Sequence, residues 1–347
     1  MKLKIPVRLS LMSGLLAVGC THAPTGGKPP VTPVTVVDTI SPEAQQFYAH
    51  PPHTFVSMDA LPLTLKRIAI NKYQDEFGAK LKEKYGADVT TQASEMAGVP
   101  VLIVQPATLK QPNQVLMNLH GGGFTLDAGS QTENIPIAAL TGRKIVAVRY
   151  RLSPEHPYPA GIDDAMAVYK KLLETYEPRN IIVYGTSAGA TMTAQLAVRL
   201  KRDGLPMPAA LGMFSLISDF SRYGESMMGL NPLIPPPPEK DLAQGKQDLI
   251  AQGNDLKDPM LSPLFADLAG LPPTLLMSGT RDLLLSQTIM MQMAMYKAGD
   301  DAQLVVFEGM MHAHWAYLDL PESREAFELQ ARFFEQHLAA NNATSTH

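Results

Sequence analysis

The residues around Ser187 could make a serine hydroxyl reactive. Residues 185–189 read Gly-Thr-Ser-Ala-Gly, between an expected strand over Asn180–Tyr184 and an expected helix from Ala188 to about Arg202. Glycines on both sides of the serine allow a sharp turn and a close approach of strand and helix. The N-terminus of the helix stabilises negative charge that develops beside the serine. The pattern predicts a nucleophilic serine presented at a turn, with a purely structural turn as the alternative.

Three consecutive glycines follow another expected strand, Gln114–Leu119. Residues 120–124 read His-Gly-Gly-Gly-Phe, so the backbone can turn back and point its N–H groups at a substrate oxygen. Acyl transfer needs such donors for its oxyanion, and losing one costs roughly 100- to 1000-fold in rate. A phosphate-binding loop is the alternative, disfavoured because no Lys-Ser or Lys-Thr pair follows. We expect the N–H groups of Gly121, Gly122 and Ala188 to hold the oxyanion.

A serine hydroxyl is a weak nucleophile at neutral pH, so it needs a base and a carboxylate that orients the base. Four histidines follow Ser187 along the chain. His337 falls inside the last expected helix, and His347 is the final residue. The base is therefore expected to be His312 or His314, which both follow the last expected strand.

The carboxylate is expected in a loop after an earlier strand, because such loops gather at one edge of a parallel sheet. Asp282 follows the expected strand Pro273–Ser278. Asp219 also follows a strand, but it opens an insertion. Asp300 and Asp301 precede a strand and are expected at the opposite edge. Asp282 is the favoured partner of the base.

The elements that must position these residues alternate between short β runs and helices. Such alternation predicts an α/β fold with a mostly parallel sheet and helices on both faces. Further strands are expected over Val99–Gln105, Lys144–Arg149, Ala209–Phe214 and Gln303–Phe307, and further helices over Asp163–Thr175, Ser286–Ala298 and Glu322–Leu338.

Two stretches interrupt the alternation. Ser41 to Gly86 reads as helical, and residues 219–265 contain four consecutive prolines at 235–238. An insertion after a strand's C-terminal end lies above the edge where open α/β sheets bind ligands. We therefore expect N-terminal cap helices over 43–86 and a catalytic domain over 87–340, with a cap insertion at about 219–265. The proline run could equally be a plain rigid loop.

The N-terminus reads as an export signal. Lys2, Lys4 and Arg8 precede an uncharged apolar stretch, and residues 17–20 read Ala-Val-Gly-Cys. This end resembles the lipobox of bacterial lipoproteins, so we expect a signal peptide over 1–20 and a lipid anchor on Cys20. Residues 21–42 read as a Pro/Thr-rich tether, or as a stub without a role. The expected location is the bacterial cell envelope, on a membrane; a soluble exported protein and a cytoplasmic one are the alternatives.

The amino-acid composition argues against several classes of binding partner and metal site. The 347 residues suffice for one large α/β domain. With 33 acidic against 29 basic residues no basic domain stands out, so nucleic acid is a poor candidate partner. One cysteine excludes an intramolecular disulfide and a zinc site built on cysteines. No cofactor motif stands out. Four methionines between 290 and 295 would fill a core or form an adaptable apolar surface. The oligomeric state is left open.

From about Val99 to Leu338 the chain resembles the hormone-sensitive-lipase-like branch of α/β-hydrolases, the bacterial carboxylesterases, in the subgroup with Gly-Thr-Ser-Ala-Gly. The resemblance implies an eight-stranded, mostly parallel sheet with a helical cap and the order Ser, Asp, His along the chain. It places the base at His312, because the family pattern ends in Gly-x-x-His-x-Phe. The motifs that carry the resemblance are residues 120–124, 150–157 (Tyr-Arg-Leu-Ser-Pro-Glu-His-Pro), 185–189, 259–264, 271–273, Asp282 and 309–312 (Gly-Met-Met-His).

The resemblance implies a serine ester hydrolase acting on short to medium acyl esters, with no cofactor or metal. Ser187 would attack the ester carbonyl, His312 would carry the proton, and Asp282 would orient His312. A deacetylase or amidase of the same fold, acting on cell-envelope or xenobiotic substrates, is one alternative. A non-catalytic ligand-binding member of the family is the other.

Overall fold

The structure is a computed structural model, and it describes residues 36–50, 61–86, 88–229 and 253–343. Four expected features lie outside these residues: the signal peptide, the lipid anchor on Cys20, most of the tether and the proline run 235–238. None of the helices in the described part of the chain is long and apolar enough to cross a membrane.

An eight-stranded sheet forms the centre of the molecule, with strand order β1-β2-β4-β3-β5-β6-β7-β8. The pairs β1–β2 and β2–β4 are antiparallel, and every other neighbouring pair is parallel. The mostly parallel eight-stranded sheet is therefore confirmed. The strands are β1 Thr90–Met96, β2 Val99–Gln105, β3 Val115–Leu119, β4 Lys144–Val148, β5 Ile181–Thr186, β6 Ala210–Phe214, β7 Thr274–Arg281 and β8 Ala302–Met311.

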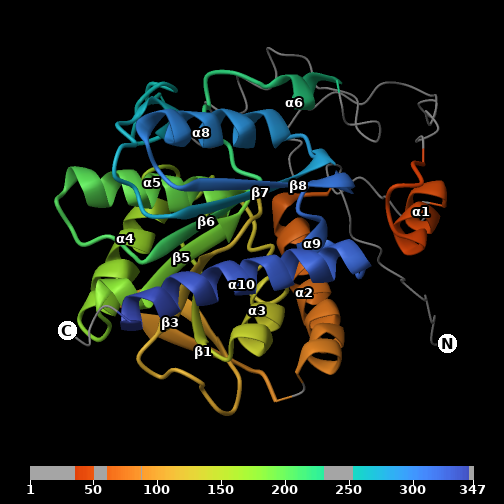
Figure 1. Ribbon diagram of the computed structural model, residues 1–347, viewed down its shortest axis with the longest axis horizontal. Coiled ribbons are helices and arrows are strands. Elements are labelled where there is room, and N and C mark those ends of the chain that lie inside the picture. The colour runs from red at the N-terminus through yellow and green to blue at the C-terminus, as the bar shows by residue number, and fades with distance from the viewer. Residues whose placement is uncertain (1–35, 51–60, 87, 230–252, 344–347) are drawn as a thin grey trace.

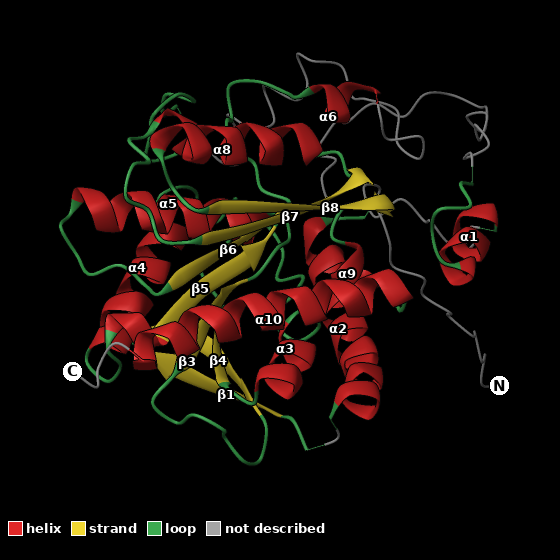
Figure 2. Ribbon diagram, viewed as in Figure 1, coloured by secondary structure: helices red, strands yellow, loops and turns green. Residues whose placement is uncertain are grey.

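Helices cover both faces of the sheet, as predicted (Figures 1 and 2). Every residue of β3 and β5 is buried, because alternate side chains along each strand point into two separate cores. Ile182 and Tyr184 face one core, whereas Ile181 and Val183 face the other. The first core is closed by α3 (Asn134–Thr141) and α10 (Pro321–Ala343), and the second by α4 (Ala160–Leu173), α5 (Ala188–Arg202) and α8 (Leu285–Ala298).

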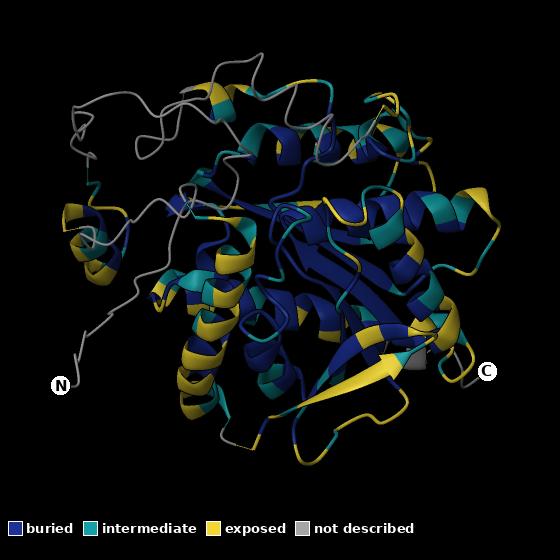
Figure 3. Ribbon diagram, turned by 180° about the vertical axis from the view of Figure 1, so that it is seen from behind, coloured by how far each residue is buried: buried dark blue, intermediate teal, exposed yellow. Residues whose placement is uncertain are grey.

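The strand β1 had no signal in the sequence. Its residues read Thr-Thr-Gln-Ala-Ser-Glu-Met, and most of them are exposed at the edge of the sheet (Figure 3). A polar edge strand lacks the apolar alternation that marks a half-buried strand. Main-chain pairing with β2, from Thr90 opposite Gln105 to Met96 opposite Val99, holds it in place.

The described part of the expected helical stretch 41–86 forms two helices, α1 (Pro42–Ala49) and α2 (Leu63–Tyr85). The hydroxyl of Ser41 caps α1 by accepting the N–H of Ala44 at 3.1 Å. Helix α2 packs against α3 through buried residues such as Phe77. Leu65 and Ile68 also recur at helical spacing, but they are 48% and 59% exposed.

The insertion after β6 is described only at its two ends. It contains the short helix α6 (Glu225–Gly229) and a 3-10 turn at Pro263–Phe265. Both ends pack near the start of α8, where Ile217, Phe220, Leu261 and Leu284 form a small buried cluster. The insertion as a cap over the site stays a prediction.

Candidate active site

The three predicted catalytic residues lie at the ends of three parallel strands. Ser187 directly follows β5, Asp282 follows β7, and His312 follows β8. Strands β5, β6, β7 and β8 are neighbours in the sheet and run in the same direction. Their carboxyl ends therefore meet at one edge of the sheet, which we call the catalytic rim.

The backbone at Ser187 is held in a conformation that costs free energy. Its φ is 58° and its ψ is −120°, outside the regions that residues other than glycine favour. The N–H of Ser187 donates to the carbonyl of Phe214 at 2.8 Å, which ties the turn to the end of β6. A Cβ at Gly189 would lie 1.8 Å from the carbonyl oxygen of Leu119, so only glycine allows this close approach. The predicted sharp turn is present.

Asp282 and His312 are brought together. Nδ1 of His312 lies 2.8 Å from Oδ1 of Asp282. The carboxylate is fully buried, and it also accepts hydrogen bonds from the hydroxyls of Ser278 and Ser215 and from the N–H of Leu284. Because several donors fix both oxygens, the carboxylate can hold the imidazole in one orientation.

The same contacts keep Asp282 ionised. Burial raises the pKa of a carboxyl group, but the imidazole of His312 and the hydrogen bonds from Ser215 and Leu284 outweigh that effect. The net result is a pKa of Asp282 below its ordinary value. A charged carboxylate beside the imidazole stabilises the imidazolium form that appears when a base has taken a proton.

His314, the other sequence candidate, lies elsewhere. Its side chain is fully buried between the rings of Phe307 and Trp315, and neither ring nitrogen makes a hydrogen bond of ordinary geometry among the described residues. Burial lowers the pKa of His314 to about 4, so the ring is neutral at physiological pH. Of the two histidines, only His312 contacts Asp282.

Ser187 and His312 share no hydrogen bond in the described part of the chain. The loop that carries His312 nevertheless lies against the serine turn, because Nε1 of Trp315 donates to the hydroxyl of Thr186 at 3.2 Å. Thr186 directly precedes the serine. Hydrogen bonds between a nucleophile and its base are often long in the absence of substrate and shorten when substrate binds.

The glycine loop contacts the serine directly. A Cβ at Gly121 would lie 3.4 Å from Cβ of Ser187 and 3.0 Å from the carbonyl oxygen of Thr186. The loop then turns back on itself: φ is 122° at Gly122 and 60° at Gly123, and the N–H of Leu126 donates to the carbonyl of Gly122 at 3.0 Å. Only glycine adopts such angles without strain.

The predicted oxyanion donors differ in their surroundings. The N–H of Gly121 faces the carboxyl group of Glu133, whereas within the described residues no backbone carbonyl accepts the N–H of Gly122 or of Gly123. Ala188 opens α5, so its N–H has no partner within the helix. Gly123 is thus a further candidate donor that the sequence analysis did not name. The run of three glycines at 121–123 could have indicated it.

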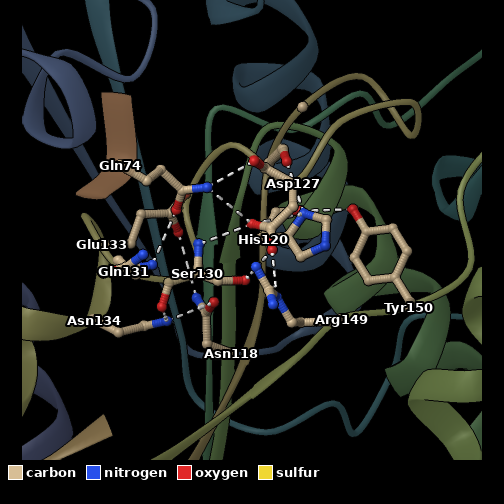
Figure 4. Close-up of polar contacts among 12 residues, drawn as sticks. Gln74, Asn118, His120, Asp127, Ser130, Gln131, Glu133, Asn134, Arg149 and Tyr150 are labelled. Atoms are coloured by element: carbon tan, nitrogen blue, oxygen red, sulfur yellow. Dashed lines mark hydrogen bonds and ion pairs between the residues drawn. The ribbon is translucent and has the colours of Figure 1, made fainter. Parts of the chain in front are cut away.

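Behind the loop lies a buried polar network (Figure 4). The carboxylate of Asp127 accepts hydrogen bonds from the hydroxyl of Ser130 at 2.8 Å and from Nε of Arg149 at 2.9 Å. The main-chain carbonyl of Asp127 accepts one from Nε2 of Gln74, on α2, at 2.7 Å. Burial raises the pKa of Asp127, but the nearby His120 and Arg149 and these hydrogen bonds bring it down to about 2. The charged carboxylate therefore braces the loop at neutral pH.

Glu133 occupies the other part of this network (Figure 4). Its Oε2 accepts Nδ2 of Asn118 at 3.4 Å, and Oε1 has no hydrogen bond of ordinary geometry among the described residues. Burial raises its pKa to about 7, although Asn118, Thr186 and Gly121 all favour the charged form. An acidic group that titrates near neutral pH thus lies behind the serine turn and the glycine loop.

A cavity lies beside the loop, between Phe124 and α5. Its lining combines apolar side chains, such as Phe124, Met192 and Leu261, with polar ones; the polar ones include Arg151, Ser153, His156 and Gln195. Among the described residues, no group of three or more His, Cys, Asp or Glu side chains is arranged to hold a metal ion.

Comparisons with known proteins identify the fold and the family. Residues 116–316 match the family model of an alpha/beta hydrolase fold. An acetyl-hydrolase of Streptomyces hygroscopicus is 32% identical over 272 residues, covering 77% of this chain and 88% of the relative. The carboxylesterase NlhH of Mycobacterium tuberculosis is 27% identical over 321 residues, covering 87% and 95%.

Solved structures point the same way. A crystal structure of an esterase superposes with a TM-score of 0.77 at 30% identity, covering 90% of this chain and 98% of that one. A hormone-sensitive lipase from a metagenome library superposes with a TM-score of 0.72 at 27% identity, covering 80% and 92%. The chain therefore belongs to the α/β-hydrolase family, in its hormone-sensitive-lipase-like branch, and is a hydrolase of the carboxylesterase type.

Proposed function

We propose that the protein hydrolyses short to medium acyl esters through an acyl-enzyme, with Ser187 as nucleophile, His312 as base and Asp282 as the orienting acid. The observation that carries this proposal is the 2.8 Å contact between His312 and the buried carboxylate of Asp282, on the same rim as the strained turn at Ser187.

In the first half of the reaction, Nε2 of His312 takes the proton from Ser187 as the hydroxyl attacks the ester carbonyl. The carbonyl oxygen becomes an oxyanion, held by the N–H groups of the glycine loop and Ala188. The imidazolium then gives its proton to the leaving alcohol, and the acyl group stays on Ser187. In the second half, His312 takes a proton from water, which attacks the acyl carbonyl. The imidazolium then returns the proton to the oxygen of Ser187 as the acyl–oxygen bond breaks and the acid is released.

The substrate class is proposed from the relatives. One relative is named an acetyl-hydrolase and another a carboxylesterase. A small acyl group fits both names, and a deacetylase acting on O-acetyl groups of cell-envelope material is the second candidate. We also propose export and a lipid anchor on Cys20, from the signal-like residues 1–20.

The test is an acyl-chain series of p-nitrophenyl esters, assayed with the wild type, Ser187→Ala and Ser221→Ala. Ser221 is a serine beyond β6 whose hydroxyl bonds Asp219. We expect Ser187→Ala to lose roughly 10⁴- to 10⁶-fold in kcat, and Ser221→Ala to stay near the wild type. A serine-directed phosphonate should add its mass to the peptide that contains Ser187.

The proposal is wrong if Ser187→Ala remains active or is labelled as fast as the wild type. Activity that peaks at acetyl or butyryl esters supports the ester substrate, and faster turnover of an acetylated polysaccharide favours the deacetylase. The anchor is checked separately by mass spectrometry of the membrane fraction, where a diacylglyceryl group on Cys20 is expected; an unmodified N-terminal region would contradict it.

A further inference from the structure

The strand that leads to His312 departs from a regular ladder just before the histidine. Gly279 on β7 pairs with Phe307 on β8, but the next pair joins Arg281 with Met311. One residue of β7 therefore faces three residues of β8, and within this irregularity φ of Gly309 is 68°. A bulge of this kind re-aims the residues that follow it, and it removes regular pairing where His312 must be placed.

The N-terminal segment packs onto this bulge. A Cβ at Gly309 would lie 2.7 Å from Cγ2 of Ile40, so the isoleucine sits directly on the glycine. The phenol oxygen of Tyr48, on α1, accepts the N–H of Met311 at 3.2 Å. The guanidinium of Arg281 lies over the ring of Tyr48, 4.6 Å from its centre. Tyr48 itself is 3% exposed.

These contacts have one feature in common. Arg281 directly precedes Asp282, and Met311 directly precedes His312. A single side chain from outside the sheet thus touches the residue before the acid and the residue before the base. We infer that Tyr48 is a positioning residue that fixes the Asp282–His312 pair by holding the ends of β7 and β8 together. This inference rests on the catalytic roles proposed above.

Helix α1 has an attachment that lets it serve as a fixed support. The main-chain N–H of Ser41 donates to Oε1 of Glu322 at 2.7 Å, and its hydroxyl donates to Oε2 at 2.9 Å. Glu322 belongs to the first turn of α10, which is packed in the core. The phenol of Tyr48 stays neutral at working pH, because burial raises its pKa to about 12. The hydrogen bond to Met311 is therefore independent of pH.

A looser acid–base pair would slow both halves of the reaction, because His312 transfers protons in each. The ester would still bind as before, since within the described residues Tyr48 contacts the strand ends behind the pair and makes no hydrogen bond to the glycine loop. Loss of the phenol oxygen is therefore expected to lower kcat and leave KM nearly unchanged. Misplacement of a reacting group by about 1 Å can cost about 100-fold, so removing one hydrogen bond should cost about 5- to 20-fold.

The test compares Tyr48→Phe with Tyr169→Phe. The hydroxyl of Tyr169 donates to the carbonyl of Pro206 at 2.9 Å, and this pair lies at the opposite edge of the sheet, before β6. Both changes remove one phenol–backbone hydrogen bond and keep the ring. We expect Tyr48→Phe to lower kcat about 5- to 20-fold and to move the midpoint of the acid limb of kcat/KM to lower pH. Tyr169→Phe should change the melting temperature without changing kcat or the profile.

Ser41→Ala provides a second route, since it weakens the attachment of α1 without altering Tyr48. Ser41→Ala should also lower kcat, by a smaller factor than Tyr48→Phe does. The inference is overturned if Tyr48→Phe melts as a folded protein and keeps the kcat and pH profile of Tyr169→Phe. His312→Asn is assayed alongside: if it remains active, the proposed catalytic roles fail, whereas an inactive His312→Asn beside an unaffected Tyr48→Phe removes the inference alone.

Discussion

The two sides of the catalytic rim are stabilised in different ways. On the side of the proposed oxyanion donors, which we call the oxyanion side, the glycine loop is backed by a buried network in which Gln74, Asp127 and Ser130 exchange hydrogen bonds (Figure 4). On the side of the proposed acid–base pair, which we call the acid–base side, β8 bulges before His312, and Asp282 is fixed by its own hydrogen bonds while Tyr48 contacts both strand ends. Many hydrogen bonds together hold the glycine loop in place, whereas the position of His312 depends on a few contacts.

The difference follows from the kind of backbone on each side. The glycine loop is irregular and buried, so its polar groups need partners within the protein, apart from the N–H groups of Gly122 and Gly123 that are candidates to hold the oxyanion. The ends of β7 and β8 are continuations of strands, and regular pairing satisfies them up to the bulge. A single substitution should therefore be felt more strongly at the acid–base end, unless it alters the glycines themselves.

Among the substitutions that compare the two sides, Asp282→Asn is expected to have the largest effect. The amide has the size of the carboxylate but carries no charge, so it neither stabilises the imidazolium nor selects the same imidazole tautomer. We expect kcat for p-nitrophenyl acetate to fall by roughly 10⁴-fold. Asp301→Asn is the control, because Asp301 is exposed and precedes β8 at the other edge of the sheet. Equal activity of the two variants would contradict the role of Asp282.

The next largest effect is expected from Gly122→Ala on the oxyanion side. A Cβ there would lie 2.1 Å from the carbonyl oxygen of Leu126, and φ is 122°. The loop must shift, so we expect kcat to fall by roughly 100-fold. Gly270→Ala is the matched control, because φ is 80° there but nothing lies within 4 Å of the new Cβ. If both variants lose kcat equally, backbone strain alone explains the effect and the oxyanion role is not supported.

The sequence predicted those parts of the catalytic rim that are marked by a short pattern of neighbouring residues. Apolar runs bounded by turns indicated seven strands, and β2 has the predicted bounds Val99–Gln105. The serine turn, the glycine loop and Asp282 were each found from residues that are neighbours along the chain. The helix α3 was missed because its sequence, Asn-Ile-Pro-Ile-Ala-Ala-Leu-Thr, is apolar all round and contains a proline.

The contacts that no local pattern predicts join distant residues. Tyr48 and Met311 are 263 positions apart, and neither stands in a recognisable motif. Trp315 and Thr186 are likewise 129 positions apart. The choice of His312 over His314 depended on the family resemblance at the level of sequence, whereas in the structure it depends on which imidazole reaches Asp282. Burial and pairing of this kind are settled by packing of the whole fold.

A substitution of Glu133 is expected to have the smallest effect on kcat. It tests whether the network behind the glycine loop tolerates the loss of one acidic group. Its pKa is raised to about 7 in the folded protein, from an ordinary value of 4.5. A raised carboxyl pKa means that the folded state binds more protons than the unfolded state between these values. The stability contributed by the neutral group is present below about pH 4.5 and is lost as pH rises through about 7.

Glu133→Gln keeps the size of the side chain and removes this loss. The difference in unfolding free energy between the variant and the wild type should therefore change with pH. We expect this difference to be about 2 kcal/mol more in favour of the variant at pH 8 than at pH 5. Urea titrations at the two pH values give the difference directly, and Glu328→Gln, on the exposed side of α10, is the control. If the difference between variant and wild type is the same at both pH values, Glu133 is not the buried acid that titrates. If it changes as expected while kcat stays within about twofold, the network behind the loop tolerates loss of one charge, as a region with many shared contacts should.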